Sequence, residues 1–136
     1  MNETNSVLIL KDLFFSEFSF KNDEQEKIKT INCTHKINEF ITKNRNEVTV
    51  NIETTITSPK TEFVLTLKTV GKFALNTDSD IEESTKMFLL TKNTVAIMLP
   101  FIRSQVSLIT TQPKFTPILL QPLDVNKLSI DCKVEE

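Results

Sequence analysis

Apolar and polar residues alternate along much of the first half of the chain, which is typical of strands that bury one face. Residues 48–57 (VTVNIETTIT) alternate most regularly, and their β-branched side chains favour a pleated sheet. Residues 63–70 repeat the pattern after a turn at 58–60, so the two runs predict an antiparallel hairpin. Two more strands are predicted at 13–21 and, with a more polar sequence, at 28–40.

The predicted faces of these strands follow from the period of two. In the first strand Phe14, Phe18 and Phe20 fall on one side, which we expect to be mainly buried. The same side of the polar strand carries the following four residues: Ile31, Cys33, His35 and Ile37. Gly71, the only glycine, follows the hairpin and suggests a bulge or a close backbone approach.

The period changes to that of a helix from Asn93 onward. One stripe of this predicted helix is wholly apolar and consists of Val95, Leu99, Ile102, Val106 and Ile109. Pro100 either kinks the helix or marks the first turn of its main part. A shorter helix ending near Leu90 is expected to follow the acidic segment 76–83, in which carboxylates favour a helix N-terminus. With the sheet buried under the long helix, residues 1–136 predict a single two-layer α+β domain.

The segment after the long helix is too apolar for an ordinary solvated connection. It places Phe115, Ile118, Leu119, Leu120 and Leu123 between three prolines. An apolar surface of this size usually marks a place where another chain binds. The helix itself is apolar nearly all round, so it must be covered on more than one side, and we expect it to pack against a second subunit as well.

Composition narrows the class of protein. The 136 residues are 39% hydrophobic and 25% charged with a net charge of -2, which indicates one soluble domain and no basic stripe for nucleic acid. No apolar run approaches the roughly 20 residues that span a bilayer, and the N-terminus lacks a positively charged leader, so a cytoplasmic protein is expected. Cys33 and Cys132 lie outside any zinc-binding spacing and are expected to be free thiols.

The sequence offers little chemistry for catalysis. His35 is the only histidine and has no recognisable Ser or Cys partner motif, and one glycine cannot build a phosphate-cradling loop or a dinucleotide fingerprint. Four carboxylates that could pair as an acid and a base fall on polar strand faces, where neither would be desolvated: Glu17, Glu47, Glu53 and Glu62. The acidic residues near position 80 lack the spacing of a calcium loop. We therefore expect a binding module without enzyme activity, metal or cofactor.

Four segments resemble the SecB family of export chaperones, and together they cover most of the chain. They are EFSFK (17–21), VTVNIETTIT (48–57), EFVLTLKTVGKF (62–73) and IMLPFIRSQVSLITTQPKFTPILLQPLDV (97–125). The last is the most specific, because its helix start, arginine and Pro-punctuated loop fall in the family's order. The matching positions are Pro100, Arg103, Phe115, Leu120, Pro122 and Asp124.

The resemblance implies a four-stranded antiparallel sheet followed by a long helix and a short C-terminal helix. It implies a dimer of dimers that assembles through the long helix, at Val95, Leu99, Ile102, Arg103 and Val106. It also implies an ATP-independent holdase that binds unfolded polypeptides, such as preproteins for export, in apolar grooves. The implied client contacts are Phe63, Phe73, Phe115, Ile118, Leu120 and Leu123.

The resemblance leaves the partner open. In the family the outer sheet face docks the translocase motor SecA, which here implies Glu17 and Val64, although Lys21 stands where the family has an acid. Residues 125–136 are also shorter than the family's second helix and its extension. Some relatives instead guard the antitoxin of a toxin–antitoxin pair, and this chain fits that role too. A third reading is a structural or small-ligand-binding domain of the same fold, with the apolar loop buried against its own sheet.

Overall fold

The computed structural model describes residues 7–22, 30–59, 62–76, 81–113 and 115–136. The strands are β1 (Leu8–Lys21), β2 (Asn32–Ile41), β3 (Glu47–Thr57), β4 (Val64–Leu75) and β5 (Ile130–Val134). The helical segments are α1 (Glu83–Phe88), the π-helical turn η1 (Leu89–Asn93), α2 (Thr94–Ile109) and the 3-10 turn η2 (Val125–Lys127). The predicted start of the second strand at residue 28, and Asp78 and Asp80 of the acidic segment, lie outside the described residues.

The strands form one sheet in the order β1-β4-β3-β2-β5. The first four strands pair antiparallel, and the hairpin predicted from the alternating runs is β3–β4. The α+β class with a long helix after the sheet is confirmed, but the four-strand count and the C-terminal helix are wrong. The C-terminal segment forms η2 and then β5, which pairs parallel to β2. Ile130, Cys132 and Val134 alternate with polar residues, and this period of two favours a strand over a helix.

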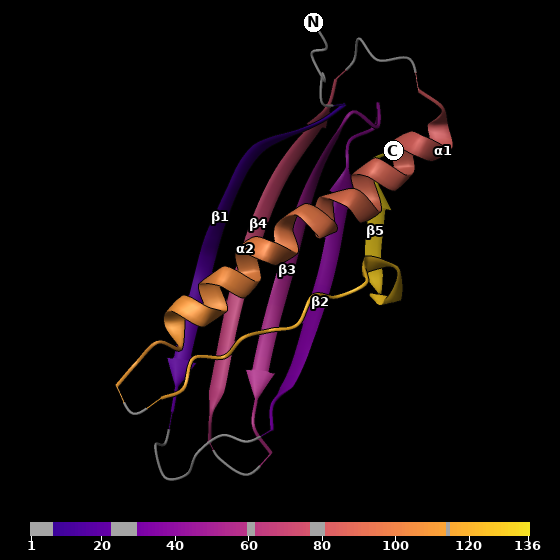
Figure 1. The fold of residues 1–136 in the computed structure, drawn as a ribbon. Helices are drawn as coiled ribbons and strands as arrows, with labels where there is room; N and C mark the ends of the chain where they lie inside the picture. Colours follow the sequence, from indigo (N-terminus) through magenta and orange to yellow (C-terminus); the bar gives the residue numbers. More distant parts are fainter. Residues whose placement is uncertain (1–6, 23–29, 60–61, 77–80, 114) are drawn as a thin grey trace, which may run out of the picture.

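Helix α2 crosses one face of the sheet diagonally and buries it (Figure 1). The predicted apolar stripe is confirmed as the buried side of the helix, where Val95, Ile102 and Val106 have no exposed surface. Gly71 of β4 lies directly beneath it. A Cβ atom added at Gly71 would lie 2.7 Å from Met98 Sδ, so close approach, and not a bulge, is the reason for this glycine.

Segments α1, η1 and α2 follow one another without a break from Glu83 to Ile109. The two helices expected from the sequence are therefore joined by the single π-helical turn η1. Pro100 lies inside α2 and is exposed, which excludes the reading that it begins the helix. Its missing N–H removes one backbone hydrogen bond from the solvent-facing side.

Strand β1 departs from a simple period of two. It begins at Leu8, five residues before the predicted start, and its register against β4 shifts between Leu10 and Asp12 and between Phe15 and Glu17. Each irregularity adds a residue and changes which side chains face the core. The predicted buried face is therefore wrong in part. The second irregularity puts Phe14, which is 41% exposed, on the opposite face from Phe18 and Phe20. Phe20 packs against the core, whereas Phe18, on the same side of this edge strand, is 55% exposed.

Candidate functional site: an apolar groove beside the long helix

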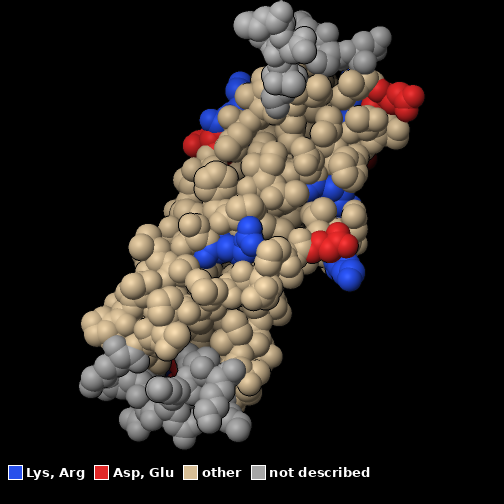
Figure 2. Space-filling model, in the orientation of Figure 1, with Lys and Arg blue, Asp and Glu red and all other residues tan. Residues whose placement is uncertain are grey.

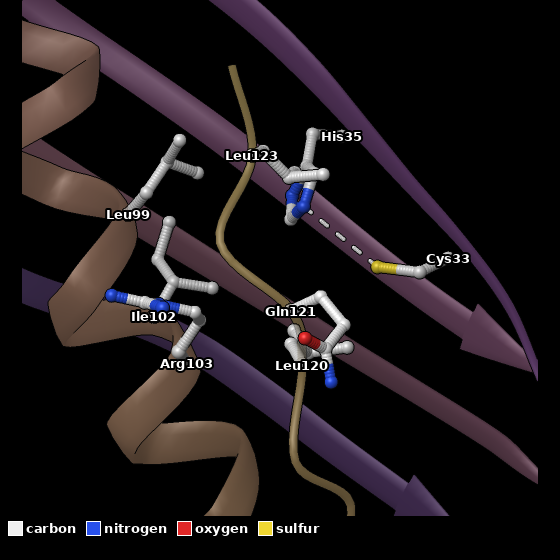
Figure 3. Close-up of a pocket in the computed structure, with 8 residues that line it drawn as sticks. All are labelled: Cys33, His35, Leu99, Ile102, Arg103, Leu120, Gln121 and Leu123. Carbon is white, nitrogen blue, oxygen red and sulfur yellow. Dashed lines mark hydrogen bonds between the residues drawn. The ribbon is translucent and has the colours of Figure 1, made fainter. Parts of the chain in front are cut away.

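An apolar cavity lies between α2, β2 and the loop that follows α2. Three elements contribute its lining residues, which are Cys33 and His35 of β2, Leu99, Ile102 and Arg103 of α2, and Leu120, Gln121 and Leu123 of the loop (Figure 3). The cavity measures about 140 Å³. We call it the groove. It far exceeds the roughly 15 Å³ that one water needs, and most of its walls offer water no hydrogen bond.

The loop stays beside the helix because two residues anchor its beginning. Thr110 Oγ1, just after α2, accepts a hydrogen bond of 2.8 Å from the Ile118 backbone N–H. The Phe115 ring stacks on Phe63 with 5.4 Å between centroids and meets Phe20 edge to face at 5.5 Å. From this anchor the chain runs back across the sheet toward β5 (Figure 1). The loop therefore forms a fixed wall of the groove opposite α2.

The floor of the groove is polar but uncharged at neutral pH. His35 Nδ1 lies 2.8 Å from Thr54 Oγ1, and Cys33 Sγ lies 3.7 Å from His35 Nε2. Burial lowers the pKa of His35 below its ordinary value and raises the pKa of the Cys33 thiol. Both side chains are therefore neutral near pH 7. The groove suits the burial of apolar groups, and its thiol stays protonated, which makes it a weak nucleophile.

The predicted client contacts divide into two groups. Phe63 and Phe73 are core residues with 1% of their surface exposed, and Ile118 is 8% exposed. Phe115 is partly covered by its ring contacts. Leu120 and Leu123 line the groove, and Leu123 is 47% exposed. The structure thus brings Leu120 and Leu123 together at the groove and places Phe63, just before β4, and Phe73, within β4, in the core.

Sequence reasoning did not assign Cys33, His35 or Gln121 to this site. Cys33 and His35 were placed on the same side of their strand as Ile37, and that face is the one that looks toward α2. The position of Cys33 and His35 on the buried face of the strand was therefore the signal that could have assigned them to the site. What the sequence lacked was the position of the loop above it, which depends on contacts between residues more than eighty positions apart.

The residues assigned to subunit contact lie mostly inside this chain. Val95, Leu99, Ile102 and Val106 are buried against the sheet, and Arg103 lines the groove. The exposed apolar side chains of α2 are instead Phe101 and Leu108, at 48% and 66%. Because a helix turns about 100° per residue, these two project from the flank opposite Arg103. We call this side the open flank.

The residues assigned to motor docking lie on the other side of the sheet. Glu17 Oε2 lies 3.5 Å from Lys68 Nζ in an exposed ion pair, and Val64 is 38% exposed. Lys68 and Val64 lie four residues apart on β4, so Glu17 and Val64 are roughly 13 Å apart along the strand. They share an accessible face without contacting each other.

One buried carboxyl group lies beneath the start of α2. Glu39 of β2 has no exposed surface, and its Oε1 has no hydrogen-bond partner. Its Oε2 lies 3.2 Å from Thr94 Oγ1, whose proton is also shared with the Leu90 carbonyl at 2.7 Å. Burial raises the pKa of Glu39 to about 8. The Thr94 hydrogen bond and the charge of Lys92 oppose this shift but are outweighed by burial, so the group is largely protonated at neutral pH.

The described residues show no metal site, disulfide or membrane-spanning helix. Within them, no three His, Cys, Asp or Glu side chains come together to hold a metal ion. Cys33 and Cys132 are free thiols. Among the helices of the described residues, none is long and apolar enough to cross a membrane.

Comparison with known proteins gives a family match and a shared fold. The model of the SecB family, described as preprotein translocase subunit SecB, matches residues 2–133. No curated protein matches the sequence. A Mycobacterium tuberculosis SecB-like chaperone, Rv1957, solved in complex with a ChAD peptide from the antitoxin HigA1, has a TM-score of 0.68 at 12% identity, over 86% of this chain and 88% of that one. A protein of unknown function from Streptococcus agalactiae reaches a TM-score of 0.44 at 11% identity, over 84% and 96% of the two chains.

Proposed function

The chain belongs to the SecB family, and we propose from this that it is a molecular chaperone that holds unfolded polypeptide in the groove without using ATP. The observation that carries the proposal is an open apolar cavity at the loop that the sequence singled out. Leu120 and Leu123 line it, and Leu123 leaves about half of its side chain accessible.

The groove offers a client non-directional attraction. Each Å² of apolar surface removed from water contributes about 25 cal/mol, whatever the order of the client's side chains. Water inside apolar walls makes few hydrogen bonds, so a client side chain displaces it at little cost. A site of this kind prefers the unfolded state of a client, because only that state exposes enough apolar side chains, and this preference delays folding and aggregation.

The scarcity of glycine supports the ATP-independent part of the proposal. Phosphate-cradling loops need several glycines for close backbone approach, and the whole chain has one. That glycine, Gly71, is buried under Met98 and is not available for a nucleotide. Binding and release of clients would then depend on affinity and competition alone.

Assembly into a dimer of dimers is part of the proposal. The open flank of α2 exposes Phe101 and Leu108, and a second copy that covered them would remove a large apolar surface from water. Several grooves on one particle would hold a long client by effective concentration, although each groove alone is weak. Subunit contact and client contact would then use opposite flanks of the same helix.

Two kinds of client fit the proposal. The family description supports preproteins for export. SecA would then dock at the accessible face that carries Glu17 and Val64. The structural neighbour that holds an antitoxin peptide supports an antitoxin as a dedicated client. The ion pair between Glu17 and Lys68 partly neutralises the docking face, which favours the antitoxin role over motor docking.

A matched pair of variants tests the groove. We expect Leu120→Asn with Leu123→Asn to weaken capture of an unfolded client about tenfold, because polar groups replace apolar wall. Leu119→Asn is the control, since Leu119 belongs to the same loop and is 74% exposed but does not line the groove. Aggregation of a denatured model protein, followed by light scattering, is the measurement.

The result also separates the chaperone from a structural or ligand-binding domain. If the protein is a chaperone, the groove variant should suppress aggregation less well, whereas the Leu119 control should suppress it as well as the unmodified protein. Full suppression by the groove variant, or none by the unmodified protein at equimolar concentration, would contradict the proposal.

A further inference from the structure

We propose that the groove selects client segments in which an acidic residue lies two positions from a large aliphatic residue. The aliphatic side chain enters the cavity, and the carboxylate binds the Arg103 guanidinium at its rim. This inference rests on the proposed function and adds a charge preference to it.

Arg103 is a cation without a partner in the described part of the chain. It is half-buried on α2, and its guanidinium makes neither an ion pair nor a hydrogen bond there. Of the eight residues that line the groove, it alone carries a charge near neutral pH, because His35 is kept neutral by burial. A guanidinium without a counter-charge favours a ligand that brings a carboxylate.

The surroundings of the groove do not supply that carboxylate. The face that carries α2 and the loop is largely uncharged, and basic and acidic groups on it are few (Figure 2). The nearest acid along the loop is Asp124, which already accepts a hydrogen bond of 3.0 Å from the Asn126 N–H. A client carboxylate would therefore meet Arg103 without competition from a fixed acid.

The spacing of two follows from an extended client. Side chains of an extended peptide alternate, so residues two positions apart lie on one side about 7 Å from each other. Strand β2 can hold a peptide in this form, because β5 pairs with it only from Ile37 onward. Residues 32–36 of β2 have no strand beside them on that edge within the described ranges, and the groove residues Cys33 and His35 belong to this stretch.

The test compares three acetylated and amidated peptides, so that no terminal carboxylate contributes. Each peptide carries one leucine. The residues two positions before and two positions after it are both glutamate in the first peptide, both glutamine in the second and both lysine in the third. We expect the full-length protein to bind the glutamate peptide about tenfold more tightly than the glutamine peptide, by fluorescence anisotropy. Arg103→Gln should abolish this difference, and Arg103→Glu should transfer the preference to the lysine peptide. Lys72→Gln, on the outer face of β4, is the control and should change nothing.

Three results would overturn the inference. Equal binding of the three peptides, together with weaker binding of all three to the Leu120→Asn variant, would remove the charge preference and leave the chaperone proposal intact. Failure of every peptide to bind, together with failure to suppress aggregation, would remove both. Dissociation of the oligomer by Arg103→Gln in sedimentation velocity would place Arg103 at a subunit contact instead.

Discussion

The two flanks of α2 present different surfaces although they belong to one helix. On the groove flank the loop covers Leu99 and Ile102 and leaves a cavity at whose edge Arg103 lies. On the open flank Phe101 and Leu108 face solvent. The groove flank has a cavity and a cation, and the open flank is a regular apolar surface without charge.

This difference suggests how one helix can serve two partners. A regular helix surface is rigid and repeats identically in every copy, which suits a symmetric contact with a second subunit. A cavity bordered by a loop accepts side chains of different shape, which suits clients that share no sequence. A partner that binds one flank leaves the other accessible.

The largest effect is expected on the open flank. Replacing both exposed residues, as Phe101→Ser with Leu108→Ser, should dissociate the subunits, because four apolar side chains per two-fold contact would lose roughly 4 kcal/mol, about a thousandfold in affinity. Stability of the folded chain should change little, since both side chains are exposed in it. Sedimentation velocity measures the assembly and urea unfolding measures the stability.

The open-flank variant should keep the groove and its affinity for short peptides. Each separated subunit retains its groove, so affinity for a short peptide should be unchanged while capture of a long client weakens through lost multivalency. An intact oligomer in the double variant would show that subunits meet elsewhere. Loss of short-peptide binding would show that the flanks are not independent.

A smaller effect is expected at Glu39, which lies beneath the N-terminal end of α2, away from both flanks. Its pKa is about 8 in the folded chain and ordinarily 4.5, so between these values the unfolded chain has released the proton and the folded chain still holds it. Stability must therefore fall as pH rises through this window. We expect Glu39→Gln to be more stable than the unmodified protein by a few kcal/mol at pH 9, with the difference shrinking toward pH 4.

Urea unfolding at several pH values measures this difference. Stability curves that run parallel from pH 4 to pH 9 would show that Glu39 is not buried as an acid. Peptide binding at pH 7 should be the same for both proteins, because Glu39 does not line the groove. The variant thus distinguishes the effect of Glu39 on stability from the effect of the groove on binding.

The sequence predicted the parts of the fold that depend on local periodicity. The alternation in 48–57 located β3, and the apolar stripe from Val95 identified the buried side of α2. The prediction failed where the structure of a segment depends on a partner far away in the sequence or on an extra residue in a strand. Irregularities in β1 turned Phe14 to the outside, and the parallel edge of β2, far away in the sequence, made a strand of the C-terminal segment.

The groove was predicted only in part for the same reason. Leu120 and Leu123 were identified because prolines surround them in an apolar loop, a signal within one segment. The alternation of Phe63 and Phe73 showed that they share a buried face, but not whether the cover is the chain's own helix or a client. Glu39 continues the side of β2 that carries His35 and Ile37, so its burial was already implied by the period of two.

Photo-crosslinking compares the two flanks most directly. A photoreactive amino acid is placed at Leu123 in the groove or at Leu108 on the open flank, and the assembled protein is irradiated with a labelled unfolded client. Position 123 should crosslink to the client, and position 108 should crosslink to a second subunit. Client adducts at position 108 with none at position 123 would contradict the division of α2 into a subunit flank and a client flank.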